Sequence, residues 1–452
     1  MAEAQEKHGT GTIEELIIAT NIDVFPRKEI DIRNLSPTIR YYESILDNNT
    51  SAIVTIQDGI NLKEELPITG GEEINLVFTD TYADSDYISS KQRNNPFRVY
   101  KLADRKKLRA NLDSYALMLG KNHLLQSNYM TVDRSYRGRA DDIVRDILKD
   151  YLKDETVWEE NVNLDRTVGL HNIIFNRLTP LQSVFKMIGE IESASDGSSC
   201  YFFWETNDGY NLRNLDNMLN QPVRTDPETN EPMKPYVYIE GDIRGDEATD
   251  PQRILSFKEG VSFDLLDGIV GGEFGVETKY FDPIRKTMQS STYLHDRDWE
   301  TTLHSNPYPA VTPVIGQEFG SRPSLEKYMV TNYLAAQADY IKSRDDDIRT
   351  FYRRKQNVVS KRNTVLKRIE SNKVEIMVYG DSRIKAGQTI EILVPKTGVD
   401  FEVNNTNDAF ASGKYLVVGV KHQIDDKEYH TLMTIVKDSN IVQPDDEGED
   451  WR

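Results

Sequence analysis

The sequence predicts a β-rich α+β fold, and three observations lead to this prediction. Residues 373–438 contain four strand-like runs separated by turn residues. Val374, Ile376 and Val378 alternate in the first run with other side chains, a period of two that is typical of a strand with unlike faces. Similar runs occur in the first 120 residues, whereas residues 137–153 show apolar side chains every four positions, as in an amphipathic helix.

The composition indicates a folded, acidic chain. A length of 452 residues exceeds one ordinary core, so we expect about three or four domains. Hydrophobic residues make up 38% and charged residues 29%, which fits a globular protein better than a disordered one. The 55 basic and 74 acidic residues give a net charge of 55 − 74 = −19. Such a surface repels nucleic acid unless basic groups are concentrated locally.

Cysteine content and hydropathy exclude several kinds of site. The one cysteine, Cys200, starts an apolar run that ends at Trp204, so we expect a small buried side chain rather than a nucleophile. A single cysteine permits neither an internal disulfide nor a cysteine-based zinc site. Residues 1–8 lack the order of a signal peptide, and no run reaches about 18 apolar residues. We therefore expect no membrane span, and synthesis in a reducing cytoplasm.

A first β-domain is expected at residues 13–125, after a flexible polar N-terminus at 1–12. Gly70 and Gly71 supply a turn before a strand at 73–79. The other elements expected in this domain are strands at 16–18, 29–32, 51–56, 97–102 and 112–119, and a short helix-compatible run at 41–46.

A small α+β domain is expected next, at residues 130–245. It begins with the amphipathic helix, and a second helix starts at Thr179 and Pro180, an N-cap followed by the proline favoured in a first turn. Asp208 and Gly209 stand between two apolar runs, which predicts a β-hairpin.

A second β-domain is expected in two pieces, 250–295 and 373–438, followed by an acidic C-terminal tail at 439–452. Three strand-like runs match the C-terminal sheet in length and alternation and are assigned to it: 253–257, 275–281 and 286–294. Turns in the C-terminal sheet are expected at Gly380, Asp381, Gly387 and Gly413.

An insertion at residues 296–372 separates these two pieces. It is loop-like to Pro323, and 326–369 carries no Gly or Pro, which predicts a helix. Basic residues concentrate in its second half and form a possible interface helix: Arg349, Arg353, Arg354, Lys355, Lys361 and Arg362. Such a helix contacts phosphates or an acidic partner in one interpretation, and is a solvated face in the other, more common one.

Clusters that resemble catalytic or metal sites all have simpler explanations. Residues 295–298 place carboxylates beside His295 but lack a third fixed ligand, and Glu190 and Glu192 point to different sides of a helix. Adjacent residues 345–347, all Asp, cannot converge on one ion if helical. The run 271–275 is glycine-rich but lacks the lysine and the strand-to-helix setting of a phosphate loop. We expect no enzyme, no metal and no cofactor.

The order of several segments resembles a known family. Three groups carry the resemblance: 41–48 with 52–56 and 66–72; 178–181 with the hairpin at 202–210; and 378–388 with 413–422. In this order they resemble the first tube domain, the middle domain and the close of the second tube domain of the baseplate central hub proteins of contractile-tailed, T4-type phages. These hubs are related to the spike-bearing hubs of type VI secretion. The segments span most of residues 13–438, and each is a pattern of modest specificity.

The resemblance implies a particular assembly. Each chain would contain two tube-type antiparallel β-barrel domains, and a homotrimer would present six near-equivalent barrels that join a three-fold central spike to a six-fold tail tube. The implied partners are the chain itself, a central spike protein, tail tube or tube-initiator proteins, and tape measure and wedge proteins. DNA would pass through the channel only as cargo, and an acidic lining would let it slide. The implied location is the tail baseplate of the virion, after assembly in the host cytoplasm. The long basic insertion departs from the simplest hubs.

Two other classes remain open. A tail-associated cell-wall hydrolase or carbohydrate-binding tail component would need a carboxylate pair in a groove, which the sequence does not identify. A DNA-binding protein would use the basic helix and bind duplex in a salt-sensitive way.

Overall fold

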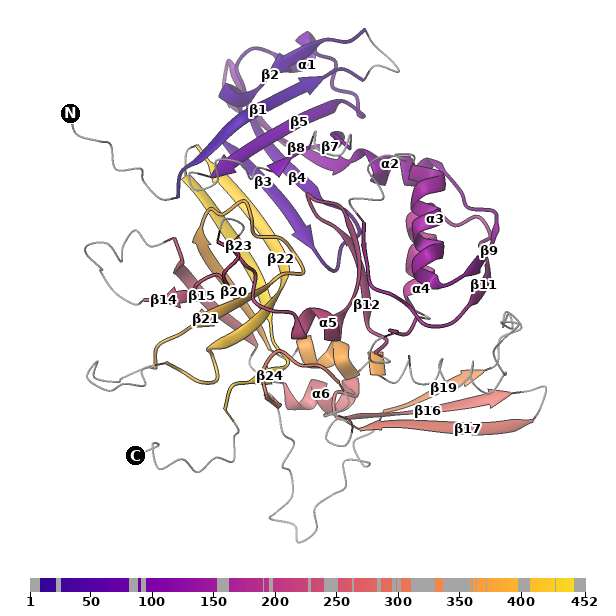
Figure 1. Ribbon diagram of the computed structural model, residues 1–452. Helices are drawn as coiled ribbons and strands as arrows, with labels where there is room; N and C mark the ends of the chain where they lie inside the picture. The colour runs from indigo at the N-terminus through magenta and orange to yellow at the C-terminus, as the bar shows by residue number, and fades with distance from the viewer. Residues whose placement is uncertain are drawn as a thin grey trace.

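The computed structural model of this chain describes most of the sequence. The described residues are 9–21, 26–80, 88–90, 95–152, 162–189, 191–194, 198–226, 229–239, 251–261, 264–282, 286–294, 298, 302–309, 330–335, 358, 361–362, 364–370, 372–396, 407–426 and 428–442. Most of the predicted N-terminal segment and the end of the predicted acidic tail lie outside these residues. Figure 1 shows two adjoining β-structures, an α+β unit beside them, and a separate arm made of strands.

Six strands near the N-terminus form the first β-structure, here called barrel 1. Their order in the sheet is β1-β5-β7-β8-β4-β3. The bounds are β1 Gly11–Ala19, β3 Thr38–Ser44, β4 Ser51–Asp58, β5 Glu73–Asp80, β7 Phe97–Arg109 and β8 Leu112–Lys121. The short strands β2 Glu29–Asp31 and β6 Ile88–Ser89 pair with β1 and β5, and the helices η1 Arg33–Leu35 and α1 Leu62–Glu65 lie in the connections.

The run at 41–46 was expected to suit a helix, and this prediction is wrong. Tyr41 and Glu43 are buried on one face of β3, whereas Tyr42 and Ser44 on the other face are partly exposed. The strand pairs with β4 on one side and β22 on the other. Such long-range pairing outweighs the local preference of a run without helix caps.

A second barrel, barrel 2, closes on itself. Its strands follow the order β22-β21-β14-β15-β20-β23, and β23 pairs back with β22. The bounds are β14 Tyr236–Tyr238, β15 Arg253–Val261, β20 Lys373–Tyr379, β21 Thr389–Leu393, β22 Gly413–Asp425 and β23 Glu428–Val436. The short strand β14 runs parallel to both of its neighbours, and the other pairs are antiparallel. The β-rich α+β fold predicted from the sequence is confirmed.

One hairpin, β22–β23, belongs to both barrels. Near its turn, β22 pairs with β3 from Gly419↔Ser44 to Asp425↔Thr38. Glu428 at the start of β23 forms a bridge with Thr10, just before β1. The hairpin thus spans the gap between β3 and β1. Ile424 and Tyr429 from this hairpin lie in the apolar core of barrel 1, so each barrel needs the hairpin for its own core.

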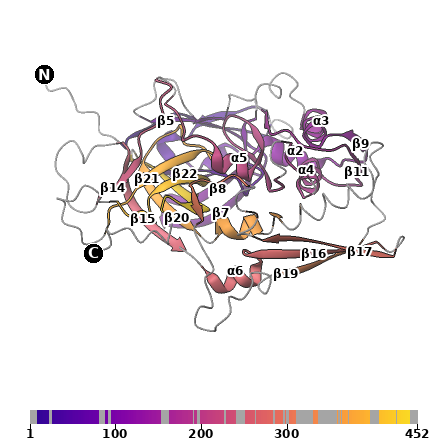
Figure 2. The ribbon, with the colours of Figure 1, turned by 60° about the horizontal axis from the view of Figure 1, so that its bottom comes forward.

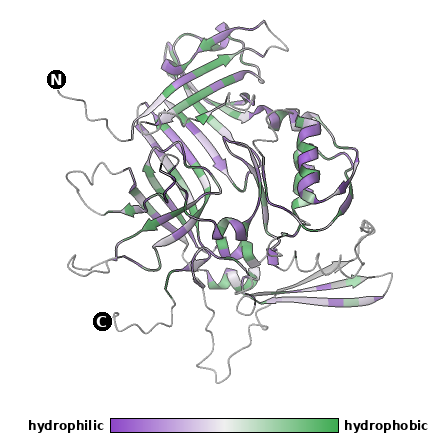
Figure 3. Ribbon diagram, viewed as in Figure 1, coloured by the Kyte–Doolittle hydropathy of each residue, from purple (hydrophilic) through white to green (hydrophobic). Residues whose placement is uncertain are grey.

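The helices and the remaining strands between the barrels form an α+β unit with its own core. Its helices are α2 Asn122–Tyr129, α3 Ala140–Leu152, α4 Pro180–Ile188 and α5 Leu215–Asn220. Its strands are β9 Ser135–Gly138, β10 Val162–Leu164, β11 His171–Ile174, β12 Tyr201–Glu205 and β13 Tyr210–Asn214. The predicted start of α4 is confirmed: Thr179 caps the helix in a capping box with Gln182, and Pro180 is its first residue. Figure 3 shows α3 with a hydrophobic and a hydrophilic face, as its period predicts.

The strand β12 is buried on both faces. Tyr201 and Phe203 pack into the core of the α+β unit, whereas Phe202 and Trp204 face a further apolar cluster, the junction cluster. This cluster also contains residues of β22, β23, α5 and the helical segment of 364–370. Cys200 lies in it and is 1% exposed, and burial raises the pKa of its thiol to about 12, so the prediction of a buried small side chain is confirmed.

Two strands that were assigned to the C-terminal sheet form a separate one. β16 Gly275–Asp282 pairs with β17 Thr287–Leu294 on one side and with β19 Val330–Ala335 on the other. Figures 1 and 2 show this sheet projecting from the body as an arm. Only β15 of the three assigned runs joins barrel 2, through β20. Alternation predicts a strand but does not name its partner, so this assignment was wrong for 275–281 and 286–294.

The insertion is less helical than predicted. β19 lies inside the run at 326–369 that was expected to be a helix, because absence of Gly and Pro permits either element, and Val330, Thr331 and Tyr333 favour a strand. Helix occurs at 361–362 and 364–370. The remaining described elements are α6 Leu265–Gly271, before the arm, and a short pair, β18 Tyr308–Pro309 with β24 Ser439–Asn440.

Candidate functional site

The turn glycines predicted from the sequence lie at the starts of strands. Gly70 and Gly71 precede β5 with φ of 113° and 87°, and Gly70 donates its amide N–H to the Glu72 carboxylate. Gly387 (φ 89°) precedes β21, and Gly413 (φ 126°) is the first residue of β22. Positive φ is the left-handed region in which a side chain is strained.

The other predicted turn residues lie at the junction between barrel 2 and the α+β unit. Asp208 and Gly209 connect β12 to β13, and Gly380 and Asp381 follow β20. Lys385, in the same loop as Asp381, donates to the Asp208 carboxylate at 2.5 Å. The two predicted turns are therefore joined by an ion pair across the two parts of the chain.

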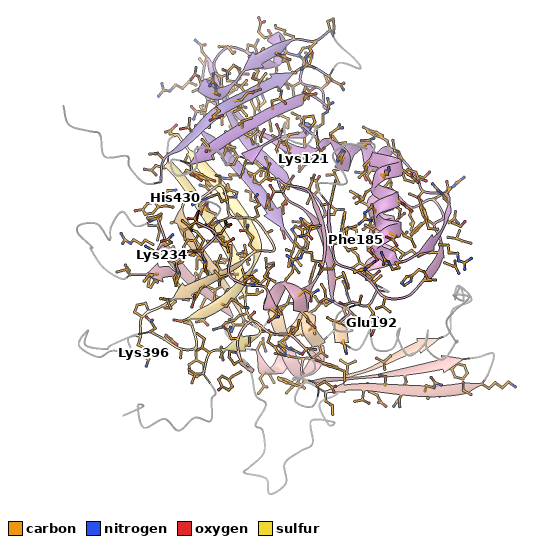
Figure 4. The ribbon with its side chains drawn as sticks, in the orientation of Figure 1. Lys121, Phe185, Glu192, Lys234, Lys396 and His430 are labelled. Atoms are coloured by element: carbon orange, nitrogen blue, oxygen red, sulfur yellow. The ribbon has the colours of Figure 1, made fainter. Side chains whose placement is uncertain are left out.

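Most of the predicted basic interface helix lies outside the described residues: Arg349, Arg353, Arg354 and Lys355. Lys361 and Arg362 are described and helical. Arg362 donates to the backbone carbonyl oxygen of Tyr201 at 3.4 Å, so its guanidinium faces β12. Of the dismissed clusters, 295–297, 345–347 and Glu190 also lie outside the described residues. Glu192, labelled in Figure 4, belongs to the α+β unit.

Buried carboxylates join the three parts of the chain, and Glu43 of β3 is the central one. It is 2% exposed and accepts hydrogen bonds from Tyr41 Oη and the Asn207 amide N, both at 2.8 Å, and from the Ala386 amide N at 3.2 Å. Asn207 lies in the β12–β13 turn and Ala386 in the loop before β21. One side chain of barrel 1 therefore holds backbone from both other parts. Burial raises the pKa of Glu43 to about 7, and the hydrogen bonds oppose this rise.

Two more acidic side chains repeat this pattern. Glu205 at the end of β12 accepts from Thr50 N at 3.2 Å and Asn95 Nδ2 at 2.9 Å, which ties the α+β unit to barrel 1. Asp80 at the end of β5 accepts from the amide N and Oγ of Ser382 at 2.6 and 2.7 Å, which ties barrel 1 to the loop after β20. Buried acceptors with donors from another part fix orientation, because each loses its partners if the parts separate.

Asp381 is held between two guanidinium groups. Arg383 Nε donates to it at 3.0 Å, and Arg224 forms a short charged hydrogen bond with it. Burial alone would raise the pKa of Asp381, but the two arginines outweigh it and hold the pKa at about 2. The segment that contains Arg224 is thereby fixed to barrel 2.

A neutral histidine, His422, lies on β22 of the shared hairpin. His422 Nε2 is 3.2 Å from the Ile384 carbonyl oxygen, and Nδ1 is 2.8 Å from Tyr429 Oη. Because a carbonyl oxygen only accepts, Nε2 carries the proton and Nδ1 accepts from the tyrosine. Burial lowers the pKa of His422 to about 4, so the ring is uncharged at neutral pH. His430, labelled in Figure 4, lies on the other strand of the hairpin, β23, in register with Tyr379 of β20.

A hydroxyl, an imidazole and a carboxylate lie in line near the end of β23. Thr302 Oγ1 is 2.9 Å from His304 Nε2, and His304 Nδ1 is 2.6 Å from Asp438 Oδ2. Asp438 is 1% exposed and also accepts from the Ser305 amide N, with Arg368 Nη1 at 3.8 Å. Burial would raise the pKa of Asp438, but its bond to His304 and the charge of Arg368 lower it to about 2. This line fastens the 302–309 segment to barrel 2.

Two cavities lie at the edges of the junction. The larger, about 420 Å³, lies between the β12–β13 hairpin and the loop before β21, and Arg213, Asn211 and Gln388 contribute polar walls. The smaller, about 230 Å³, is lined by Tyr236, Asp381 and Arg383. Within the described parts of the chain, no group of three or more His, Cys, Asp or Glu side chains is placed to hold a metal ion. No helix among those residues is long and apolar enough to cross a membrane.

Sequence reasoning missed the carboxylates at the junction. A signal was present for Glu43, since it shares a face with Tyr41 in an alternating run, and an acidic residue on an inward face needs buried donors. The donors themselves, Asn207 and Ala386, could not be assigned because they lie more than 160 and 340 positions further along the chain, as the separations show.

The fold is similar to that of solved phage tail proteins. The tail protein from Neisseria meningitidis MC58 aligns over 94% of this chain and 96% of its own, with a TM-score of 0.51 and 11% sequence identity. The 43 kDa tail protein of prophage MuSo2 from Shewanella oneidensis aligns over 94% and 98%, with a TM-score of 0.49 and 8% identity. The E. coli c3393 protein, a component of the type VI secretion system, aligns over 89% and 73%, with a TM-score of 0.43 and 9% identity. No family model and no curated protein matches the sequence.

At the level of the fold, the resemblance predicted from the sequence is confirmed. The chain has the fold of a phage tail protein, in which nearly the whole of both chains aligns.

Proposed function

We propose that this chain is a structural hub of a phage tail baseplate. The observation that carries the proposal is the pair of barrels within one chain, joined edge to edge by the β22–β23 hairpin, in a fold shared with a phage tail protein. The proposed location is the virion tail, after assembly in the host cytoplasm.

In the proposed assembly, three copies place six barrels in a ring around the channel for DNA. A cyclic arrangement closes on itself and leaves no free end for further addition. Each chain would occupy two neighbouring places, and the net charge of −19 would keep DNA from adhering to the ring. The ring would join a three-fold central spike to a six-fold tail tube, and the proposed contractile-tail partners include tube-initiator, tape measure and wedge proteins.

The geometry of the junction supports a rigid rather than a hinged hub. Glu43, Glu205 and Asp80 each hold backbone or side-chain donors of another part, and all three are at most 5% exposed. A load-transmitting protein must keep its two barrels at a fixed angle, and buried charged acceptors at the junction provide this. The barrel, middle and insertion boundaries given from the sequence remain part of this proposal.

The first test is the mass of the purified chain in solution, measured by light scattering over a range of concentrations, alone and with a candidate spike protein. A trimer in either condition supports the hub. A monomer that ignores the spike overturns the proposed assembly.

A second candidate function is a cell-wall hydrolase that cleaves amide bonds, rather than the sugar linkages that need a carboxylate pair, and the line from Thr302 through His304 to Asp438 favours testing it. This arrangement has the order of groups that activates a hydroxyl nucleophile. A peptidoglycan zymogram with the wild-type chain and with His304→Ala decides the matter. Lysis by the wild type that the substitution abolishes would establish the enzyme. If neither protein causes lysis, Thr302, His304 and Asp438 have a structural role only.

A further inference from the structure

The β7–β8 hairpin contains a basic ribbon on an otherwise acidic chain. Residues 100–113 hold five basic residues, Lys101, Arg105, Lys106, Lys107 and Arg109, against two acidic ones, Asp104 and Asp113. The ribbon therefore carries 5 − 2 = +3. The rest of the chain carries (55 − 5) − (74 − 2) = −22, so the contrast between the two is large.

The β7 strand of this ribbon has a free edge. β4 pairs with β8 along nearly the whole length of β8, from Ser51↔Gly120 to Asp58↔Asp113, whereas β5 pairs with β7 only at Glu73↔Arg98 and Ile74↔Phe97. From residue 100 onward, β7 has no strand partner other than β8 among the described residues. Every residue of β7 from Asp104 to Arg109 is exposed, on both faces.

Charge and apolar surface occur together on this ribbon. Arg105 forms an ion pair with Asp113 at 2.7 Å, while Lys101, Lys106, Lys107 and Arg109 have no ion pair within the described part of the chain. Tyr100 and Leu108 are each 52% exposed. The side chains thus offer both an attraction for acidic groups and apolar area to bury at a contact.

The position of the ribbon in barrel 1 indicates which molecule it would contact. In the order β1-β5-β7-β8-β4-β3, β7 lies three strands from β3, the strand through which barrel 2 is attached. The ribbon therefore lies on the side of barrel 1 away from the β3 edge to which barrel 2 is joined. In a ring in which each chain fills two neighbouring places, that side meets the next copy.

We propose that the β7–β8 ribbon docks on a second copy of this chain and contributes electrostatically to ring closure. The occupant is a second copy because, outside the ribbon, every copy carries −22, and because the ribbon lies on the side that a cyclic neighbour would reach. This inference rests on the proposed assembly. Lysines on an edge strand also discourage pairing with the edge strands of unrelated molecules. The basic charges therefore favour contact with an acidic surface over non-specific strand pairing.

The test compares two charge-reversed variants of the full-length chain. One carries Lys106→Glu, Lys107→Glu and Arg109→Glu on the ribbon. The matched control carries Arg145→Glu, Lys149→Glu and Lys186→Glu, three exposed basic residues on α3 and α4. Both variants change the net charge by the same amount, so a difference between them reports position rather than total charge. Sedimentation velocity at 50 and 500 mM NaCl gives the dissociation constant of the oligomer.

We expect the wild-type oligomer to weaken about tenfold or more at the higher salt, because screening reduces contacts between exposed charges. The ribbon variant should bind about a hundredfold more weakly than wild type at low salt, and the control within about threefold of wild type. A ribbon variant that assembles like wild type overturns this inference but leaves the proposed hub intact. A wild-type chain that is monomeric throughout, with and without spike, overturns both.

A nucleic-acid role for the ribbon gives a different result. In that case the ribbon variant would assemble normally and would lose retardation of duplex DNA, which would overturn the second-copy proposal. A single Lys107→Cys substitution supplies a further readout, since the native Cys200 is buried and 1% exposed. A polarity-sensitive fluorophore on that cysteine should shift its emission on assembly, and an unchanged emission in the oligomer would contradict docking at the ribbon.

Discussion

Glu43 of β3 accepts a hydrogen bond from the backbone amide of Asn207 at 2.8 Å, and this bond crosses from barrel 1 to the β12–β13 turn. The same carboxylate accepts from the Ala386 amide of barrel 2. A single buried side chain therefore contacts barrel 1, barrel 2 and the α+β unit. Because the contacts involve its carboxylate, the ionisation of Glu43 should make the stability of this junction depend on pH.

The first prediction concerns this coupling. The pKa of Glu43 is raised by burial to about 7 in the folded chain, from an ordinary value of 4.5. A group that binds protons more tightly when folded adds stability at low pH, and this contribution is lost as pH rises from about 4.5 to about 7. The loss should be on the order of 3 kcal/mol. Urea unfolding at pH 5, 6, 7 and 8 should give a slope over this range that Glu43→Gln makes shallower.

A matched control for this experiment is Glu29→Gln, at an exposed position on β2. It should change stability little at each of these pH values, because the Glu29 side chain is exposed and forms only a surface ion pair with Arg27. Equal slopes for wild type and Glu43→Gln would mean that Glu43 does not titrate in this range.

The second prediction concerns acid stability. The pKa of Asp438 is held at about 2, so its contribution is fully present above the unfolded value of about 4 and is lost as pH falls toward 2. Asp438→Asn should lose about 2–3 kcal/mol at pH 7 and show less further loss between pH 4 and pH 2. Asp31→Asn serves as the control, since Asp31 forms an exposed pair with Arg33 and should cost less than about 1 kcal/mol. Equal losses for the two variants at pH 7 would contradict a special role for Asp438.

The third prediction separates backbone strain from packing at two glycines. An added Cβ at Gly387 would lie 2.4 Å from Trp204 Cζ2, whereas one at Gly70 would have nothing within 4 Å. Both residues have positive φ, so both alanine variants pay for backbone strain of about 1–2 kcal/mol. Gly387→Ala should lose a further 1–3 kcal/mol or so, because Trp204 must move within the junction cluster. The stability of the two variants is compared by their urea unfolding midpoints, measured by fluorescence. Equal losses of stability would show that Trp204 can move aside without a measurable cost.

The sequence predicts the presence of a strand where a local pattern is enough to define it. It does not predict which sheet a strand joins, because that depends on a partner far away in the chain. Alternation correctly indicated β20, a strand-like run indicated β23, and the residues at 179–180 indicated the start of α4. The same alternation in β16 and β17 said nothing about which sheet they join, and they form the arm. Because pairing partners are set by three-dimensional packing, local periodicity leaves them open.

The candidate site was the least predictable part. Glu43 was not predicted, because the run at 41–46 was expected to suit a helix, and its donors are main-chain amides in distant turns. Backbone donors carry no residue type, so no motif marks them. The turn residue Gly387 was visible because its positive φ favours glycine.

The last prediction follows from the shared hairpin. Ile424 lies on β22, a strand of barrel 2, yet its side chain is in the core of barrel 1, whereas Ile392 of β21 belongs to the barrel 2 core alone. Ile424→Ala and Ile392→Ala should each cost about 2–5 kcal/mol, the usual range for truncating a buried isoleucine. Because both strands of the hairpin serve both barrels, Ile424→Ala should destabilise both barrels together and unfold them in one transition. Amide hydrogen exchange, resolved by peptide, measures this directly. Faster exchange confined to β1, β4, β5 and β8 would show that barrel 1 opens by itself, and that the hairpin does not couple the two barrels.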